Sequence, residues 1–198
     1  MIDLDELDPD PIRAFQDVLD RARAAGVEYP ETMALATATP DGRPSARMVL
    51  LKGADRRGFA FYTNYESRKG GELESNPRAA LVLYWRELGV QVRVEGTVEK
   101  LPRRESAAYF ATRPRGAQVS AWVSPQSRPV SGRGELEAAH AEAEERFGDG
   151  GIPLPPHWGG YLVVPDAIEF WQHRDDRLHD RRRYTRARDT WRSERLAP

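Results

Sequence analysis

The chain has 198 residues, of which 39% are hydrophobic and 31% are charged, and its formal net charge at pH 7 is -1. This length fits a single domain with a sizeable core, and the near-zero charge gives no support to a nucleic-acid-binding protein that works by bulk positive charge. The absence of cysteine excludes disulfides, thiolate metal sites and a cysteine nucleophile. No apolar run reaches transmembrane length and the start is acidic, so we expect no membrane association and a cytoplasmic location.

The predicted elements begin with a leader and a helix. Residues 1–9 are expected to form a flexible acidic leader. Asp10 and Pro11 are typical of a helix start, because aspartate caps the first turn and proline fits the first helical position. Apolar residues at helical spacing extend this helix to Gly26. Residues 10–198 are expected to form one domain.

Five strands, separated by short turns, are predicted next. They cover residues 33–39, 45–52, 59–64, 79–85 and 90–100, and a short helix over 67–75 precedes the fourth. Residues 90–100 alternate between apolar and polar side chains, whereas 79–85 is almost continuously apolar and indicates burial on both faces. Five or six antiparallel strands without long helices between them favour a small closed barrel, which has no exposed edges.

The pattern changes after Pro102. Helices are expected over 103–112, 117–123 and 134–147, then a structured loop over 148–160, strands over 161–164 and 168–171, and a hairpin around 182–184 and 190–192. The predicted fold class is therefore mainly β with flanking helices (α+β).

The segment Arg47–Lys69 contains the first candidate site. Two apolar runs, 48–51 and 59–62, are joined by a turn rich in charge and glycine. Cationic and hydroxyl groups lie at the ends of both runs, and two adjacent strands that end in this way can form a phosphate-binding site. The alternative is a hairpin with ordinary charged ends.

Other chemical motifs are lacking. The four histidines have no metal-ligand spacing, so no metal site is predicted. Neither a Walker loop nor a GxGxxG turn after a strand occurs. The arginine run 181–183 could indicate RNA binding, but acidic neighbours dilute it and favour a solvated hairpin face. No nucleic-acid partner is therefore expected.

Four separated stretches together resemble the pyridoxine/pyridoxamine 5'-phosphate oxidase family. They are RMVLLK and FYTNYESRKG within residues 47–70, Tyr109-Phe110 with RPRGAQ and AWVSPQS up to residue 127, PLPPHWGG at 153–160, and EFWQ with RLHDR and the final RLAP after residue 169. The resemblance covers roughly residues 10–198 in unbroken order. It implies a six-stranded antiparallel split β-barrel that forms a homodimer, with FMN bound at the subunit interface.

The resemblance also assigns site residues by matching position. It implies FMN contacts from Arg47, Met48, Val49, Leu50, Leu51, Lys52, Tyr62, Thr63, Arg68, Lys69, Gln91, Gln126, Ser127, Trp171 and Arg181. It implies substrate contacts from Lys52, Tyr109, Arg113, Ala117, Arg177, Leu178 and His179, of which Arg177 and His179 are the catalytic pair. Arg68, Lys69 and Thr63 suit the FMN phosphate, while Trp171 has an alternative interpretation as a core residue.

The activity implied is FMN-dependent oxidation of pyridoxamine or pyridoxine 5'-phosphate to pyridoxal 5'-phosphate. Hydride passes from the substrate C4' carbon to flavin N5, and dioxygen reoxidises the flavin and gives hydrogen peroxide. The protein places one carbon against the flavin and neutralises charge.

Two positions depart from the family pattern. Ala117 stands where many members have serine, and the lost hydroxyl is worth about 1 kcal/mol of phosphate binding. The leader MIDLDELDPDP does not match the Arg-Arg-Glu-Tyr segment that closes over the substrate in many members. Either the lid is absent or another element replaces it.

Two alternatives therefore stay open beside the vitamin B6 oxidase. A related branch, the flavin oxidases of phenazine biosynthesis, acts on larger tricyclic substrates, which a missing lid would suit. A split-barrel module that binds a cofactor without turnover is the third possibility, although the RLHDR segment at 177–181 argues against it. The retained substrate residues favour the vitamin B6 reaction.

Overall fold

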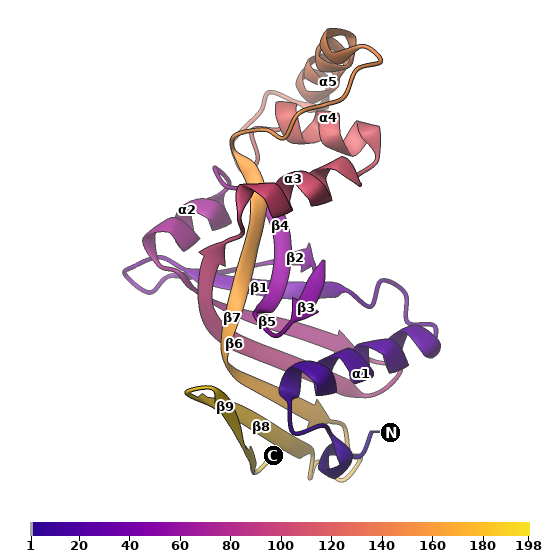
Figure 1. The fold of residues 1–198 in the computed structure, drawn as a ribbon, viewed down its shortest axis with the longest axis vertical. Coiled ribbons are helices and arrows are strands. Elements are labelled where there is room, and N and C mark those ends of the chain that lie inside the picture. Colours follow the sequence, from indigo (N-terminus) through magenta and orange to yellow (C-terminus); the bar gives the residue numbers. More distant parts are fainter. Residues whose placement is uncertain (1) are drawn as a thin grey trace.

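One antiparallel sheet of nine strands organises residues 2–198, which are the residues that this computed structural model describes (Figure 1). The strand order is β2-β1-β5-β6-β7-β4-β3, with β8 paired to β7 and β9 paired to β8. The strands are β1 Thr32–Ala38, β2 Pro44–Leu50, β3 Gly53–Asp55, β4 Gly58–Asn64, β5 Arg78–Trp85, β6 Val90–Lys100, β7 Trp158–Gln172, β8 Asp180–Ala187 and β9 Thr190–Arg195.

The first six strands of this path, from β2 to β4, form the predicted barrel. Its two ends meet where the Lys52 backbone N–H donates to the Ala60 carbonyl oxygen at 2.8 Å and where β3 pairs with β4. The mainly β class with flanking helices is thus confirmed, and the hydrogen-bonded sheet is larger than six strands because β3 and the β8–β9 hairpin extend it. Burial along β5 alternates, and Tyr84 is 56% exposed in the single chain. The prediction that both faces of this strand are buried is therefore wrong for the single chain.

The long strand β7 replaces the two strands predicted over 161–164 and 168–171. Pairing between β6 and β7 continues past Pro165, with a register shift between Glu95 and Gly96. A Cβ atom at Gly96 would lie 2.1 Å from the Val164 carbonyl oxygen, so only glycine permits the backbones to approach this closely. The bulge therefore lets one strand run from the barrel to the β8 hairpin.

Five α-helices surround the sheet. They are α1 Pro11–Ala24, α2 Arg68–Ser75, α3 Arg103–Ala111, α4 Arg115–Val123 and α5 Arg133–Phe147. Asp10 and Ser67 cap α1 and α2 through their side-chain oxygens, as the sequence predicts for Asp10. Helices α3 to α5 gather at one end of the molecule, beside the start of β7, while β8, β9 and both chain ends lie at the other (Figure 1). No helix within residues 2–198 is both long and apolar enough to cross a bilayer.

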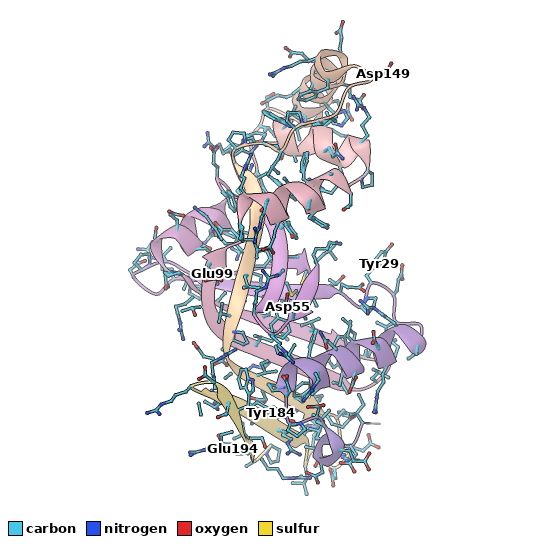
Figure 2. The ribbon with its side chains drawn as sticks, in the orientation of Figure 1. Tyr29, Asp55, Glu99, Asp149, Tyr184 and Glu194 are labelled. Atoms are coloured by element: carbon cyan, nitrogen blue, oxygen red, sulfur yellow. The ribbon has the colours of Figure 1, made fainter. Side chains whose placement is uncertain are left out.

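Residues 2–9 of the leader pack against the domain, and Met1 lies outside the described part. The expected flexibility of the leader stays a prediction. Leu4–Glu6 forms a short 3-10 helix, and Ile2 and Leu4 are only 3% and 4% exposed. The hydroxyl of Tyr184, labelled in Figure 2, donates to the Asp8 carbonyl oxygen at 3.0 Å. Two apolar side chains among the acidic ones fix the segment in the core.

Helix α1 closes the barrel through its apolar face. Phe15 is fully buried and its ring meets that of Phe59 edge to face, with centroids 4.9 Å apart. The Trp85 ring lies 6.1 Å away on the same side. These contacts join α1 to β4 and β5, and aromatic pairs of this kind add to the free energy gained from burial.

We expect Phe15→Ala to lower the free energy of unfolding by about 3–5 kcal/mol, because it leaves a cavity between α1 and the barrel. Arg13→Ala, on the exposed face of the same helix, is the control and should change it by less than about 0.5 kcal/mol. Urea unfolding of both variants measures the difference, and equal losses would contradict the role given to Phe15.

Candidate functional site

A cleft of about 730 Å³ opens beside β2 and the end of β4, next to α2, α3 and α4. Predicted FMN and substrate positions make up most of its lining, namely Arg47, Met48, Val49, Leu50, Lys52, Tyr62, Thr63, Arg68, Lys69, Tyr109, Arg113, Gln126 and Ser127. The fold therefore brings three separated sequence stretches to one cavity, as the motifs predict.

The first polar group in the cleft surrounds the buried ammonium of Lys69. Its Nζ donates to Thr63 Oγ1 at 3.0 Å, to Ser67 Oγ at 3.1 Å and to Gln126 Oε1 at 2.9 Å. Burial and the neighbouring Arg47 guanidinium lower the pKa of Lys69 to about 8. The ammonium is therefore still mostly charged at pH 7, and an anion bound beside it would gain a charge-assisted hydrogen bond.

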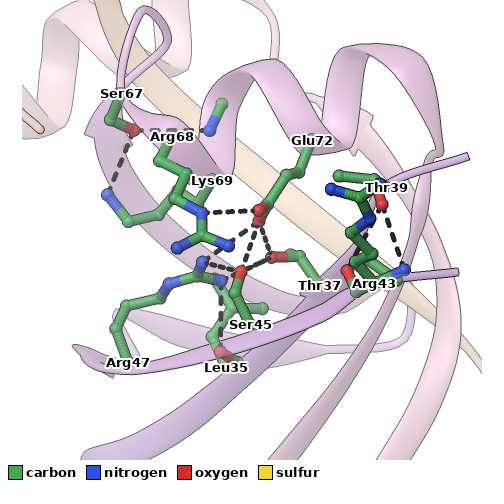
Figure 3. A network of polar contacts seen from close by, with 12 residues as sticks. Leu35, Thr37, Thr39, Arg43, Ser45, Arg47, Ser67, Arg68, Lys69 and Glu72 are labelled. Atoms are coloured by element: carbon green, nitrogen blue, oxygen red, sulfur yellow. Dashed lines mark hydrogen bonds and ion pairs between the residues drawn. The ribbon is translucent and has the colours of Figure 1, made fainter. Parts of the chain in front are cut away.

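Glu72 is a member of this group that the sequence interpretation missed (Figure 3). Its carboxylate accepts from Thr37 Oγ1 at 2.5 Å and Ser45 Oγ at 2.6 Å. Arg47 Nη2 and Arg68 Nε donate to it at 3.1 Å and 2.9 Å. The spacing of four residues from Arg68 on one helix was a signal that could have identified it.

The pKa of Glu72 reflects these donors. Burial of the carboxyl opposes ionisation, but the hydrogen bonds from Ser45, Thr37 and the two arginines outweigh it and lower the pKa to about 2. The carboxylate thus holds two guanidinium groups in place at the mouth of the cleft. Because it cancels only one of the charges on Arg47, Arg68 and Lys69, the group keeps a net charge near +2, which suits a phosphate of about -2.

A second polar group lies against the aromatic wall of the cleft. The rings of Tyr62 and Tyr109 stack with centroids 4.0 Å apart, and the Trp158 ring stacks on Tyr62 at 5.6 Å. The Arg113 guanidinium lies 4.7 Å from the Trp158 centroid, and Lys52 Nζ lies 6.0 Å from that of Tyr109. Arg113 Nη1 is buried without a hydrogen-bond partner, and burial lowers the pKa of this guanidinium. An unpaired buried donor of this kind calls for an anion.

The remaining predicted residues do not line this cleft. Gln91, Trp171 and Arg181 form one row across β6, β7 and β8, since Gln91 pairs with Trp171 and Trp171 pairs with Arg181. Leu51 is buried in the core, and Ala117 lies in the first turn of α4 without lining the cavity.

The loop over 173–179 connects β7 to β8 and contains Arg177 and His179, the predicted catalytic pair. Arg177 has a φ of 67°, which is uncommon for a residue with a side chain. The His179 ring lies 4.6 Å from that of Trp171, and its Nδ1 accepts the Arg174 backbone N–H at 3.1 Å. Leu178 is largely exposed. The predicted site residues of one chain therefore lie in two separate parts. The first is the cleft, and the second is the row on β6, β7 and β8 together with the 173–179 loop.

We expect Glu72→Gln to lower the free energy of unfolding of the apoprotein by about 2 kcal/mol at pH 7. The pKa of Glu72 is lower in the folded protein, about 2, than its ordinary value of 4.5. The stabilisation is therefore complete above pH 4.5 and is lost as the pH falls toward 2. Denaturant unfolding at several pH values measures it, with Glu74→Gln on the exposed side of α2 as control; a difference that does not shrink in acid would contradict the assignment.

Comparisons with known proteins identify the family of this chain. A family model described as pyridoxamine 5'-phosphate oxidase matches residues 19–147. A second, described as the pyridoxine 5'-phosphate oxidase C-terminal dimerisation region, matches residues 158–198 and supports a homodimer.

Two similar curated proteins bear the name pyridoxine/pyridoxamine 5'-phosphate oxidase. The Rubrobacter xylanophilus protein is 59% identical over 194 residues, which cover 98% of this chain and 89% of the relative. The Salinibacter ruber protein is 56% identical over 197 residues, which cover 98% of this chain and 92% of the relative.

Solved structures place the fold in the same group. PhzG from Burkholderia lata 383, solved with tetrahydrophenazine-1-carboxylic acid, matches with a TM-score of 0.94 and 35% identity over 100% of this chain and 98% of its own. A pyridoxamine 5'-phosphate oxidase-related, FMN-binding protein from Nostoc punctiforme shares the fold, with a TM-score of 0.74 and 21% identity over 93% of this chain and 96% of its own. The chain belongs to the pyridoxamine 5'-phosphate oxidase family of split-barrel proteins, whose cofactor is FMN.

Proposed function

We propose that this protein is an FMN-dependent oxidase that converts pyridoxamine or pyridoxine 5'-phosphate to pyridoxal 5'-phosphate, with dioxygen as acceptor and hydrogen peroxide as product. The observation that carries the proposal is the buried, unpaired Nη1 of Arg113. Lys52 and Tyr109 line the same part of the cleft and add an ammonium and a phenol donor. A substrate phosphate would satisfy all three groups.

The group of cations around Lys69 is proposed to bind the cofactor. Arg47, Arg68 and Lys69 fit the phosphate of FMN in number and charge, and Thr63 adds a hydroxyl. FMN, when bound, supplies the two-electron acceptor of the reaction. Two distinct cationic groups in one cleft thus match a phosphorylated cofactor together with a phosphorylated substrate.

The second part of the site is proposed to come from a partner subunit. Met48 and Leu50 on β2 and Tyr84 on β5 are exposed hydrophobic side chains on strands beside the cleft and the row of Gln91. Exposed apolar patches of this kind are typical of protein interfaces. A second copy seated there would bring its Trp171 and Arg181 to FMN and its 173–179 loop to the substrate.

Arg177 and His179 are proposed to orient the pyridine ring. Because His179 Nδ1 accepts the Arg174 N–H, the neutral imidazole carries its proton on Nε2 and can donate it toward the substrate. The Arg177 guanidinium is suited to stacking on an aromatic ring. Both side chains therefore fix the carbon to be oxidised in one position, which is the main contribution of a protein to such a reaction.

A flavin oxidase of the phenazine type is the second candidate. It is favoured by the structural likeness to PhzG and by the position of the leader, because none of residues 2–9 lines the cleft. An open cleft would admit a tricyclic substrate. The two candidates differ in the anionic group of the substrate. The first requires a phosphate, whereas the compound bound to PhzG carries a carboxylate.

The deciding experiment supplies FMN-loaded protein with pyridoxamine 5'-phosphate, pyridoxine 5'-phosphate and tetrahydrophenazine-1-carboxylic acid in separate assays. We expect hydrogen peroxide and pyridoxal 5'-phosphate from the first two. Turnover no faster than that of free FMN would overturn the proposal. Oxidation of the phenazine compound alone would establish the second candidate instead.

We expect Arg113→Gln to raise KM for pyridoxamine 5'-phosphate about 10- to 100-fold, since a hydrogen bond to a charged group is worth about 1.5–3 kcal/mol. Arg115→Gln is the matched control, because Arg115 contacts the carbonyl oxygens of Gly148 and Gly150 and does not line the cleft. Steady-state kinetics measure both variants, and an unchanged KM in Arg113→Gln would contradict its role.

We expect Arg177→Ala to leave FMN bound and to lower kcat/KM about 100-fold, the usual scale for loss of substrate positioning. Arg188→Ala is the control, because Arg188 also has a positive φ of 56° but lies outside the site. Flavin fluorescence and turnover are measured together. Loss of the flavin from Arg177→Ala would show that our division of roles is wrong.

A further inference from the structure

We propose that the N-terminal segment, residues 2–8, is a clamp that positions the 173–179 loop, and that Asp5 is its main polar contact. The inference rests on the proposed function, which assigns Arg177 and His179 of this loop to the substrate. It gives the leader a role different from that of a lid. The segment contacts Gln172 before the loop and, through Arg195, Asp180 after it, and none of residues 2–9 lines the cleft.

The first contact of the clamp is at the start of the loop. The Ile2 backbone N–H donates to Gln172 Oε1 at 2.8 Å, and Gln172 is the last residue of β7. Gln172 Nε2 in turn donates to the carbonyl oxygens of Leu88 and Gly89, both at 3.1 Å. All the described polar atoms of this buried amide are therefore used, and Ile2 completes the set.

The second contact is at the end of the loop. The Asp5 carboxylate pairs with the Arg195 guanidinium, through Nε at 3.2 Å and through Nη2. Arg195 Nη1 lies 3.3 Å from Asp180 Oδ1, and Asp180 is the first residue of β8. Asp180 Oδ2 accepts from Arg174 Nε at 2.6 Å.

This relay ends at the predicted catalytic histidine. Arg174, which Asp180 holds by its side chain, donates its backbone N–H to His179 Nδ1. The chain of contacts therefore runs from Asp5 through Arg195, Asp180 and Arg174 to His179. A displacement of Asp5 would loosen the group that sets the tautomer and orientation of the imidazole.

The loop contains a residue whose backbone conformation requires support from its surroundings. Arg177 has a positive φ, and a residue with a side chain holds that conformation only when its surroundings impose it. Leu178 is largely exposed. The two anchored ends are what the surrounding structure supplies.

The experiment compares Asp5→Asn, a double variant that adds Ile2→Ala, and the rescue variant Asp5→Glu. Ile2→Ala removes the buried side chain that holds the Ile2 N–H against Gln172. Asp41→Asn is the matched control, because the Asp5 and Asp41 side chains are both 58% exposed and each pairs with an arginine. Three quantities are measured on FMN-loaded protein: hydrogen exchange of the 173–179 amides, the Kd of FMN, and kcat/KM for pyridoxamine 5'-phosphate.

We expect Asp5→Asn to speed exchange of the loop amides and to lower kcat/KM, each about threefold, which is the scale of one exposed ion pair. The double variant should reach about tenfold, and Asp5→Glu should restore most of the loss. The Kd of FMN should change by less than about twofold, since Trp171 and Arg181 are held by the β7–β8 pairing itself.

Loop exchange and kcat/KM equal to those of Asp41→Asn would overturn the clamp. A parallel rise in the Kd of FMN would also overturn it, because that result indicates general loosening of the fold. If the double variant does not fold, the single exposed substitution still gives the result. If the unmodified protein does not oxidise the vitamer, the proposed function fails, and the exchange measurement decides the clamp independently.

Discussion

The carboxylate of Glu72 is the interaction on which the cofactor end of the molecule depends. It is a buried anion that joins α2 to β1 and β2, and it receives two guanidinium groups as well as two hydroxyls. Without it, three cations would face one another in a partly buried cleft, at a large electrostatic cost. The same carboxylate leaves the group with the net positive charge that a phosphate requires. One side chain thus contributes to the stability of the fold and to the charge of the proposed phosphate site.

The antiparallel sheet explains why the site is divided. Side chains at paired positions of neighbouring strands form rows on one face of a sheet. The row of Gln91, Trp171 and Arg181 lies near the end of β7, away from the half of β7 that pairs with β4. In the proposed homodimer, each copy would offer its row to the cleft of the other.

In the leader, two buried apolar side chains attach an acidic segment to the domain. Composition alone indicates a mobile tail, since acidic residues dominate the first nine positions. Ile2 and Leu4 are nevertheless buried in the core, and Asp5 pairs with Arg182 on β8 and Arg195 on β9. The segment therefore packs against the strands that flank the 173–179 loop.

The sequence by itself determined the elements that local patterns encode: the capped helix α1, the alternating strand β6, and the fold class. It also indicated, by motif resemblance, most of the residues that line the cleft. Only the tertiary structure revealed Glu72 as the counter-ion, the docking of residues 2–9, the continuous β7 and the division of the site. The last three depend on contacts between residues far apart in the chain, which local spacing does not record. For Glu72 the spacing from Arg68 was a local signal, but its other partners, on β1 and β2, lie 25 or more residues away in the chain.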